Sequence, residues 1–316
     1  MSMFIRKSLL PVLLACAGLT IRAVGDFDIR IPGEFQKIVP ESAELKKLGG
    51  GLGFVEGPAW FAQDGGYLIF SDIPAERLMK WSAKDGLTIY RTNTHGANGN
   101  CVDREGRLVT CEHLSRRVTR TEKDGTIHPL VERYEGGRFN SPNDVVVKSD
   151  GTVWFSDPDY GLGKVPPEVP GMYVYRLWPE TGKIMPVVKD CDHPNGLCFS
   201  PDEKRLYVAD SGKPRQIMVY DVKKDGTLSN ERVFCMIDKG VPDGIRCDET
   251  GRVFSSAEDG VQIFDKEGKL IGKILVPEVP ANLCFGGKER KTLFITARTS
   301  LYCIEISVKG AKLGNF

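Results

Sequence analysis

The sequence has almost no excess charge, because 43 Lys and Arg residues are balanced by 42 Asp and Glu residues. Nucleic acid binding needs a basic face, so a nucleic acid partner is not expected. The chain has only four His residues and no CxxC pair, which gives little support for a structural zinc site. It also lacks the GxSxG motif of a serine hydrolase.

Long hydrophobic runs are missing as well, apart from one near the start. The first residues read MSMFIRK and then SLLPVLLACAGLTI, a cationic start followed by an apolar run too short to span a bilayer comfortably. Residues 23–25 form a small-x-small cleavage pattern, so residues 1–25 are predicted to be a secretory signal peptide. We therefore expect an exported protein, periplasmic or extracellular, with lipidation at Cys16 as an alternative and no integral membrane span.

Helical periodicity is also scarce, since only the short segment 41–48 suggests a 3.6-residue apolar repeat. A different repeat is present: an acid or amide stands at the start of a strand-like run in FVEGPAWF, GANGNCVD, SPNDVVVK, HPNGLCFS and VPDGIRCD. We call these the slot residues: Glu56, Asn98, Asn143, Asn195 and Asp243. All of them except Asn143 are followed by Gly. A sixth copy, ANLCFGGKERKTLFITA, has Ala281 in the slot.

The slots are 42, 45, 52, 48 and 38 residues apart, and each is followed by short strand patterns separated by Gly-containing turns. Periods of this length predict a β-propeller. We expect an all-β fold with six four-stranded blades in which residues 26–316 form a single domain. The sixth repeat runs out early, so an N-terminal strand is predicted to close the last blade, with segment 34–39 (EFQKIV) available. Residues 159–172, rich in Pro and Gly, are predicted to be a loop near the slots.

The slots predict a metal site, because the first strand of each blade lines the central channel. Carboxylate and amide oxygens would then meet at one end of that channel, and Ca²⁺ binds six to eight oxygen ligands. Mg²⁺, Mn²⁺ and Zn²⁺ are alternatives, although Mg²⁺ prefers a tighter octahedral cage. A simpler interpretation is that Asn-Gly and Asp-Gly are turn residues at strand starts.

The second strands of four repeats end in an acid: Asp72, Glu112, Asp157 and Asp210. These acids either line the rim of the pocket, orient the slot amides, or cap loops. The cysteines Cys101, Cys198 and Cys284 share one repeat position, which favours small buried hydrophobic residues over disulfide partners. A pair between Cys101 and Cys111 across one hairpin is the alternative.

Several longer segments resemble the senescence marker protein/gluconolactonase (regucalcin-like) family, in its bacterial gluconolactonase-like branch. They are FVEGPAW, ANGNCVDREGRLVTCEHLSRRVTR, RFNSPNDVVVKSDGTVWFSDPDYG, PNGLCFSPDEKRLYVADSG, VPDGIRCD and NLCFGG with LFITA. The resemblance implies a six-bladed propeller that holds one divalent ion, usually calcium. The ligands would be Glu56, Asn143, Asn195 and Asp243.

The resemblance also implies hydrolysis of a lactone or related ester, most specifically of a sugar-acid lactone, with Asp243 as base or nucleophile. From their positions, Asn98, Glu112, His113 and Tyr160 are candidates to bind a small-molecule substrate. We expect a monomer or weak oligomer. Two alternatives remain: a phosphotriester hydrolase with the same site, and a non-catalytic exported propeller that is pinned by calcium and binds carbohydrate or protein.

Overall fold

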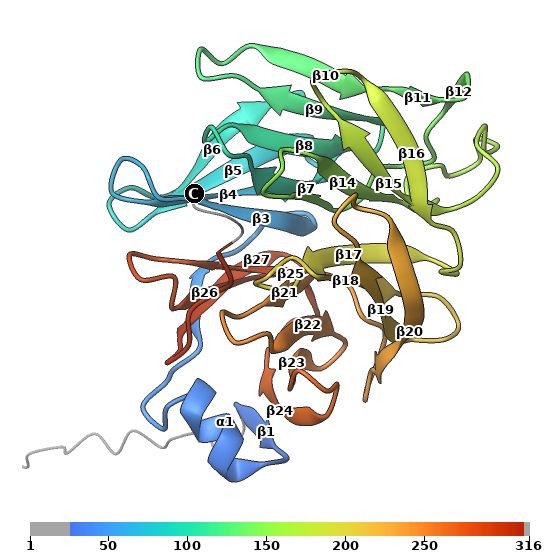
Figure 1. Cartoon of the computed structure of the whole chain (residues 1–316). Helices are drawn as coiled ribbons and strands as arrows, with labels where there is room; N and C mark the ends of the chain where they lie inside the picture. The colour runs from blue at the N-terminus through green and yellow to red at the C-terminus, as the bar shows by residue number, and fades with distance from the viewer. Residues whose placement is uncertain (1–25, 313–316) are drawn as a thin grey trace, which may run out of the picture.

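The innermost strands of six antiparallel sheets form a closed ring in the computed structural model, which describes residues 26–312 (Figure 1). Each inner strand contacts the inner strand of the next sheet, and the last contacts the first. The inner strands are β3 (Val55–Phe61), β7 (Ala97–Val102), β13 (Val145–Val147), β17 (Pro194–Phe199), β21 (Ile245–Cys247) and β25 (Pro280–Gly286). This ring confirms the predicted all-β, six-bladed propeller.

Most blades are built from consecutive strands that run outward from the ring. Blade 1 continues with β4 (Tyr67–Asp72), β5 (Arg77–Ser82) and β6 (Gly86–Thr92), and blade 2 with β8 (Leu108–Glu112), β9 (Arg117–Thr121) and β10 (Ile127–Val131). Blade 3 continues with β14 (Val153–Asp157), β15 (Tyr173–Trp178) and β16 (Lys183–Val188), and blade 4 with β18 (Arg205–Asp210), β19 (Gln216–Val222) and β20 (Leu228–Met236). Blade 5 continues with β22 (Val253–Ala257), β23 (Gly260–Phe264) and β24 (Leu270–Leu275), and blade 6 with β26 (Thr292–Ala297) and β27 (Ser300–Glu305). A two-stranded ribbon, β11 (Arg133–Tyr134) and β12 (Gly137–Arg138), precedes blade 3.

N-terminal strands complete two blades. Strand β2 (Lys46–Gly49) pairs with β27 and closes blade 6, as predicted, and β1 (Phe27–Ile29) adds a fifth strand to blade 5. The segment predicted for this closure was wrong, because residues 34–39 belong mainly to helix α1 (Pro32–Ile38). The weak helical pattern at 41–48 is also not a helix: it leads into β2.

The helix forms because its two large apolar residues are three positions apart. Phe35 and Ile38 therefore lie on one helical face, whereas in a strand they would point to opposite faces. Both are buried in a core cluster with Phe254, Ile263 and Ile304, which joins blades 5 and 6. Pro32 suits the first turn of a helix, where its missing N–H costs no hydrogen bond.

The cysteines, the loop after β14 and the N-terminal segment were the other features predicted from the sequence. All eight described cysteines are free and all but Cys101 are buried, so the hydrophobic interpretation is confirmed and the Cys101–Cys111 pair was wrong. Residues 159–172 contain no helix or strand, as expected. No helix within residues 26–312 is long and apolar enough to cross a membrane. The signal peptide and Cys16 lie outside the described residues and stay predictions.

Candidate metal and substrate site

The slot residues lie where the inner strands begin, at one end of the ring. In β3, β7 and β17 the pairing with the next strand shifts register at the slot, so that Glu56, Asn98 and Asn195 each fall at a β-bulge. Asn143 and Asp243 directly precede β13 and β21. A bulge releases a residue from the regular alternation of a strand and redirects its side chain. The bulges therefore explain how equivalent residues leave their sheets to face a common centre.

Gly is required after these slots because the backbone of the neighbouring inner strand lies too close for a side chain. A Cβ atom on Gly57 would lie 2.1 Å from the carbonyl oxygen of Asn98, and one on Gly99 would lie 2.4 Å from that of Asn143. A Cβ atom on Gly196 would meet the carbonyl oxygen of Asp243 at 2.2 Å. Such distances are far shorter than any contact a side-chain carbon tolerates, so Gly allows neighbouring inner strands to approach closely. The slot residues are thereby drawn together.

Four of the slot side chains carry oxygen atoms that lack a partner. Glu56 Oε2 and the Oδ1 atoms of Asn98, Asn143 and Asn195 are buried and accept no hydrogen bond from any described residue. Buried polar atoms almost always have a partner, so these four acceptors at equivalent positions are available to a ligand. The fifth slot residue, Asp243, is partly exposed. As a residue it is the most exposed of the five, because the other four slot residues are buried.

The two slot carboxylates interact unfavourably. Burial and then the negative charges of Asp243 and Asp144 hold the pKa of Glu56 well above its usual range. Burial and the charge of Asp144 raise the pKa of Asp243 to about 7. Crowded carboxylates with raised pKa values and free amide oxygens beside them are the donor set that a hard divalent cation stabilises. The residues therefore fit such an ion.

This donor set differs from a site made of ionisable ligands only. Among residues 26–312, no three His, Cys, Asp or Glu side chains are grouped so as to hold a metal. The slot cluster provides two such side chains, Glu56 and Asp243, and its other oxygens belong to amides. Calcium sites commonly combine carboxylate and amide oxygens in this way.

A supporting network lies next to Glu56 and was missed from the sequence. Asn282 Nδ2 donates to Glu56 Oε1 at 2.8 Å and to Asp144 Oδ2 at 3.3 Å, and Arg246 Nη1 donates to the same Asp144 oxygen at 3.2 Å. Asn282 follows Ala281, the residue expected in the sixth slot. Asp144 and Asn282 thus stand where the other four slots are followed by Gly. These two departures from the Gly pattern were the available signal for the network.

Asn98 is held by His113 rather than by another slot residue. Asn98 Nδ2 lies 2.9 Å from His113 Nε2, and burial lowers the pKa of His113 to about 4. The imidazole is therefore neutral at neutral pH and accepts the amide hydrogen at Nε2. This contact orients Asn98 so that its Oδ1 remains available. Asn98 and His113, both predicted to bind substrate, are thus brought together.

Tyr160 reaches the same end of the channel from the loop 159–172. Its ring is about half exposed and stacks on His193 with centroids 5.8 Å apart. Burial, together with the negative charge of nearby Asp243, raises the pKa of the Tyr160 phenol to about 12. The next residue, Gly161, donates its N–H to Ser141 Oγ at 2.9 Å, and a Cβ there would lie 2.9 Å from His113 Cβ. The loop therefore places Tyr160 close to both Asp243 and His113.

The acids that end the second strands cap loops. Asp72 accepts the backbone N–H groups of Gly53 and Phe54, Asp157 that of Asn140, and Asp210 those of Asp192 and His193. Each of these loops leads into the inner strand of the same blade. These acids hold the loop that precedes the slot, which is the capping alternative rather than a rim that binds substrate.

Glu112 is separated from the other predicted substrate residues. It is 1% exposed, and its carboxylate is occupied by Arg117 Nε at 2.7 Å, Thr119 Oγ1 at 2.9 Å and Ser115 Oγ. No oxygen of Glu112 is left without a partner among the described residues. The geometry gives Glu112 a structural role and no support for substrate contact.

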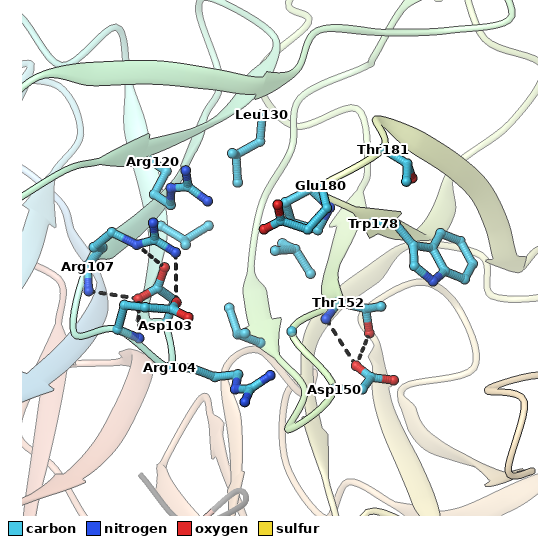
Figure 2. A pocket seen from close by; sticks show the side chains of 16 residues that line it. Asp103, Arg104, Arg107, Arg120, Leu130, Asp150, Thr152, Trp178, Glu180 and Thr181 are labelled. Atoms are coloured by element: carbon cyan, nitrogen blue, oxygen red, sulfur yellow. Dashed lines mark hydrogen bonds and ion pairs between the residues drawn. The ribbon is translucent and has the colours of Figure 1, made fainter.

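A pocket of about 190 Å³ between blades 2 and 3 lies away from the slots (Figure 2). It is lined by the turns that follow β7 and β13 and by residues 178–181, and two of its acids are paired with arginines. Asp103 accepts from Arg107, and Asp150 pairs with Arg176. None of the slot residues lines it, so it is not part of the candidate site.

Residues 54–299 match the family described as the SMP-30/Gluconolactonase/LRE-like region. The chain belongs to this family. A gluconolactonase of Zymomonas mobilis is 30% identical over 89% of this chain and 85% of its own. A pentonolactonase of Haloferax volcanii is 28% identical over 76% of this chain and 80% of its own. The solved structure of a gluconolactonase from Xanthomonas campestris is 37% identical, with a TM-score of 0.83, and covers 89% of this chain and 95% of that one. The predicted family resemblance is therefore confirmed.

Proposed function

We propose that this protein is a lactonase, a carboxylic ester hydrolase that opens a sugar-acid lactone with the help of a bound divalent cation, most suitably Ca²⁺. The observation that carries the proposal is the set of buried, partnerless oxygens of Glu56, Asn143 and Asn195 beside the Asp243 carboxylate. These four residues would hold the ion. The named relatives, a gluconolactonase and a pentonolactonase, support the lactone class as substrate.

The donor set favours a hard cation of flexible geometry. Two carboxylates balance the charge of a divalent ion, and neutral amide oxygens add ligands without adding charge. When bound, such an ion would polarise a carbonyl oxygen and stabilise the negative charge that develops on it during acyl transfer. The four ligands would be held by four different blades, because each lies at the start of an inner strand or directly before it.

Asp243 is the residue best placed for the chemical step. It is the most exposed of the slot residues, and its carboxylate interacts with the Asn195 side chain. It also lies close enough to Tyr160 for its negative charge to help raise the pKa of that phenol. A carboxylate in this position either removes a proton from an attacking water or attacks the lactone carbonyl itself. In both cases the carbonyl carbon gains a bond to oxygen and the ring C–O bond breaks.

The polar groups around Asp243 provide contacts for a hydroxylated substrate. Asn98 Oδ1 is free to accept a hydrogen bond from a sugar hydroxyl, since its amide nitrogen is held by His113. The half-exposed Tyr160 ring offers an apolar face and a phenol at the mouth of the site. A sugar lactone presents both hydroxyl groups and C–H faces, which matches this combination.

The first experiment measures metal content and turnover on the same preparation. Purified protein is analysed for bound metals, and hydrolysis of aldonolactones is measured before chelation, after chelation and after addition of Ca²⁺, Mg²⁺, Mn²⁺ or Zn²⁺. We expect activity to be lost with the metal and restored best by Ca²⁺. Unchanged turnover in fully chelated protein would refute the metal requirement.

The second experiment separates catalysis from metal binding. Asp243→Asn is compared with Asp124→Asn, which makes the same chemical change in the exposed β9–β10 turn. Calcium affinity is measured by calorimetry alongside turnover. We expect Asp243→Asn to lose at least a hundredfold in kcat, the range that a positioned proton-transfer group contributes. Full turnover with calcium still bound would remove Asp243 from the catalytic role.

A panel of substrates tests the alternatives. Aldonolactones, aryl esters and a phosphotriester are offered to the calcium-loaded protein. Hydrolysis of the phosphotriester alone would favour a phosphotriesterase with the same site. Tight calcium binding with no hydrolysis of any substrate would favour a non-catalytic propeller, an alternative that nothing in the comparisons supports.

A further inference from the structure

The central channel contains a second chamber beyond the slot residues. This chamber has a volume of about 660 Å³ and is lined by the downstream parts of all six inner strands, including Ala59, Val102, Val147, Phe199, Cys247 and Phe285. The turns after β7 and β25 and residues 311 and 312 form its rim. None of the slot residues lines it. Its size lies within the range of about 300–1,000 Å³ that is typical of small-molecule sites.

The rim of this chamber is positively charged. Arg104, Lys288, Arg290 and Lys312 line it. Arg290 Nη1 donates to the carbonyl oxygen of Gly310 at 2.8 Å, whereas the other three side chains have no hydrogen bond or ion pair with any residue in the described part of the chain. Figure 2 shows the Arg104 side chain extending away from the pair formed by Asp103 and Arg107.

The acids at the rim do not neutralise these cations. Arg107 Nε binds Asp103 at 2.7 Å, and Arg107 Nη2 binds Glu105 at 2.7 Å. Arg107 carries one positive charge and contacts Glu122 as well, so it offsets only part of the negative charge of the two rim acids. The four cations that line the mouth still outnumber these two acids, and the excess positive charge attracts an anion.

Apart from Arg246, Asn100 and Gln63, the wall of the chamber is apolar. It combines aliphatic and aromatic side chains with four thiols, those of Cys101, Cys198, Cys247 and Cys284. Cys198 Sγ and Cys247 Sγ are 3.6 Å apart, and all four thiols are free. Burial raises the pKa of Cys284 to about 12, so this thiol remains neutral at physiological pH. Neutral thiols behave as small hydrophobic groups.

One further cation lies deeper in the chamber. Arg246 lines it, and among the described residues only its Nη1 is bound, to Asp144 Oδ2 and to the carbonyl oxygen of Ile245. The pairing with Asp144 balances its charge, so the excess positive charge is concentrated at the mouth. The chamber therefore offers a cationic entrance and an apolar interior.

We propose that this chamber is a binding site for a small organic anion with an apolar body, such as a medium-chain carboxylate. The acid group would lie between Arg104 and Lys288, and the body would pack against the apolar wall formed by the inner strands. The combination of charge and apolar surface selects against a neutral molecule of the same shape and against a purely hydrophilic anion. The inference does not depend on the lactonase proposal.

The test uses a fluorescent anion and a pair of matched competitors. The full-length protein is titrated with 8-anilinonaphthalene-1-sulfonate, whose fluorescence rises in apolar sites, and the probe is displaced with octanoate or with neutral octanamide. We expect one saturable probe site per chain, displaced by octanoate and at least tenfold less well by octanamide. No saturable site, or equal displacement by the two competitors, would overturn the proposal.

Charge reversal at the rim locates the site. The double variant R104E/K288E is compared with K84E, which reverses one exposed charge in the β5–β6 turn, away from the chamber. All three residues are exposed, so none of the changes endangers folding, whereas a change at Arg246 would leave buried Asp144 without its cation. We expect the dissociation constant of octanoate to rise at least tenfold in the double variant and less than twofold in K84E. Similar affinity in both variants would overturn the proposal.

Thiol labelling gives an independent readout of the same chamber. Cys101, the one cysteine of the described chain that is not classed as buried, is modified with methyl methanethiosulfonate, and the modified peptide is quantified by mass spectrometry. We expect saturating octanoate to slow this modification at least fivefold, with no effect of octanamide. Equal modification rates with and without octanoate would place any bound anion outside the chamber.

Discussion

Individual residues at the hub are organised by a network that crosses between blades. Arg246 of blade 5 holds Asp144 of blade 3, Asn282 of blade 6 bridges Asp144 and Glu56, and Glu56 belongs to blade 1. The amide of Asn282 occupies one oxygen of Glu56 and leaves the other without a partner. Hydrogen bonds of this kind orient a metal ligand and raise its effective affinity.

Removal of the Asn282 amide should weaken the proposed metal binding, although Asn282 is not itself a proposed ligand. In Asn282→Ala, Glu56 and Asp144 both lose a donor inside a buried site. We expect calcium affinity to fall roughly 10- to 100-fold, and the unfolding free energy of the metal-free protein to fall by about 1–3 kcal/mol. Calorimetry and urea unfolding measure the two effects. Wild-type calcium affinity in this variant would show that Asn282 does not position Glu56.

A second residue-scale effect concerns the pH dependence of stability. Burial raises the pKa of Asp157 to about 8, and its Oδ1 has no partner among the described residues. In the unfolded chain the same group titrates near its ordinary value of about 3.9. Between these values the folded state keeps a proton that the unfolded state has released, so the contribution of Asp157 to stability is lost as pH rises from about 4 to 8.

Asp157→Asn should therefore remove part of the pH dependence of the free energy of unfolding. The amide cannot ionise and still offers an oxygen to the N–H of Asn140, which Asp157 accepts at 2.8 Å. We expect the free energy of unfolding of the variant, relative to wild type, to increase steadily between pH 4 and pH 8. Urea unfolding across this range gives the difference curve. A flat difference curve would mean that Asp157 is ionised in the folded protein at every pH tested.

At the scale of elements, the inner strands are governed by how closely they approach one another. The Gly that follows a slot has no room for a side chain, because the carbonyl of the next slot lies against it. The helix α1 shows the opposite situation, since nothing lies within 4 Å of a Cβ placed on Gly33. The same substitution should thus have opposite effects in the two elements.

Gly196→Ala and Gly33→Ala form a matched pair that tests this difference. A Cβ on Gly196 would force β17 away from the residues before β21, so we expect a loss of about 1–3 kcal/mol in unfolding free energy and weaker calcium binding. Gly33→Ala should raise stability by about 0.4–1 kcal/mol, because it lowers the entropy of the unfolded chain where space is free. Urea unfolding measures both. A stable Gly196→Ala variant with normal calcium affinity would contradict the crowding argument.

For the whole molecule, ring closure connects the termini to the site. Strand β2 joins blade 6, β1 joins blade 5, and α1 fills the core between these blades with Phe35 and Ile38. The two ends of the channel then have different characters. One end gathers carboxylate and amide oxygens, and the other combines an apolar wall with unpaired cations.

The sequence by itself determined the blade number and the strand order, and it predicted the slot residues as oxygen donors. These follow from local chemistry that repeats along the chain: alternating apolar residues, Gly-containing turns, and an acid or amide at the start of five of the six inner strands. The family resemblance added the expected role of Asp243. Such features can be recognised because every blade needs the same strands and tight turns, so the same residue types recur at the same positions.

The tertiary structure alone decided which residues support those donors and which do not. Glu112 shares its position with capping acids, and Arg117 occupies its carboxylate. Asn282, at the position directly after the sixth slot, instead bridges Glu56 and Asp144 across the channel. Residues 34–39 became a helix because Phe35 and Ile38 had to face one core, while the short β2 closed the ring. The physical reason is that contacts between blades join residues far apart in the chain. Hydrophobic periodicity and secondary-structure propensity are local properties, so they do not predict which side chains meet at the axis of the propeller.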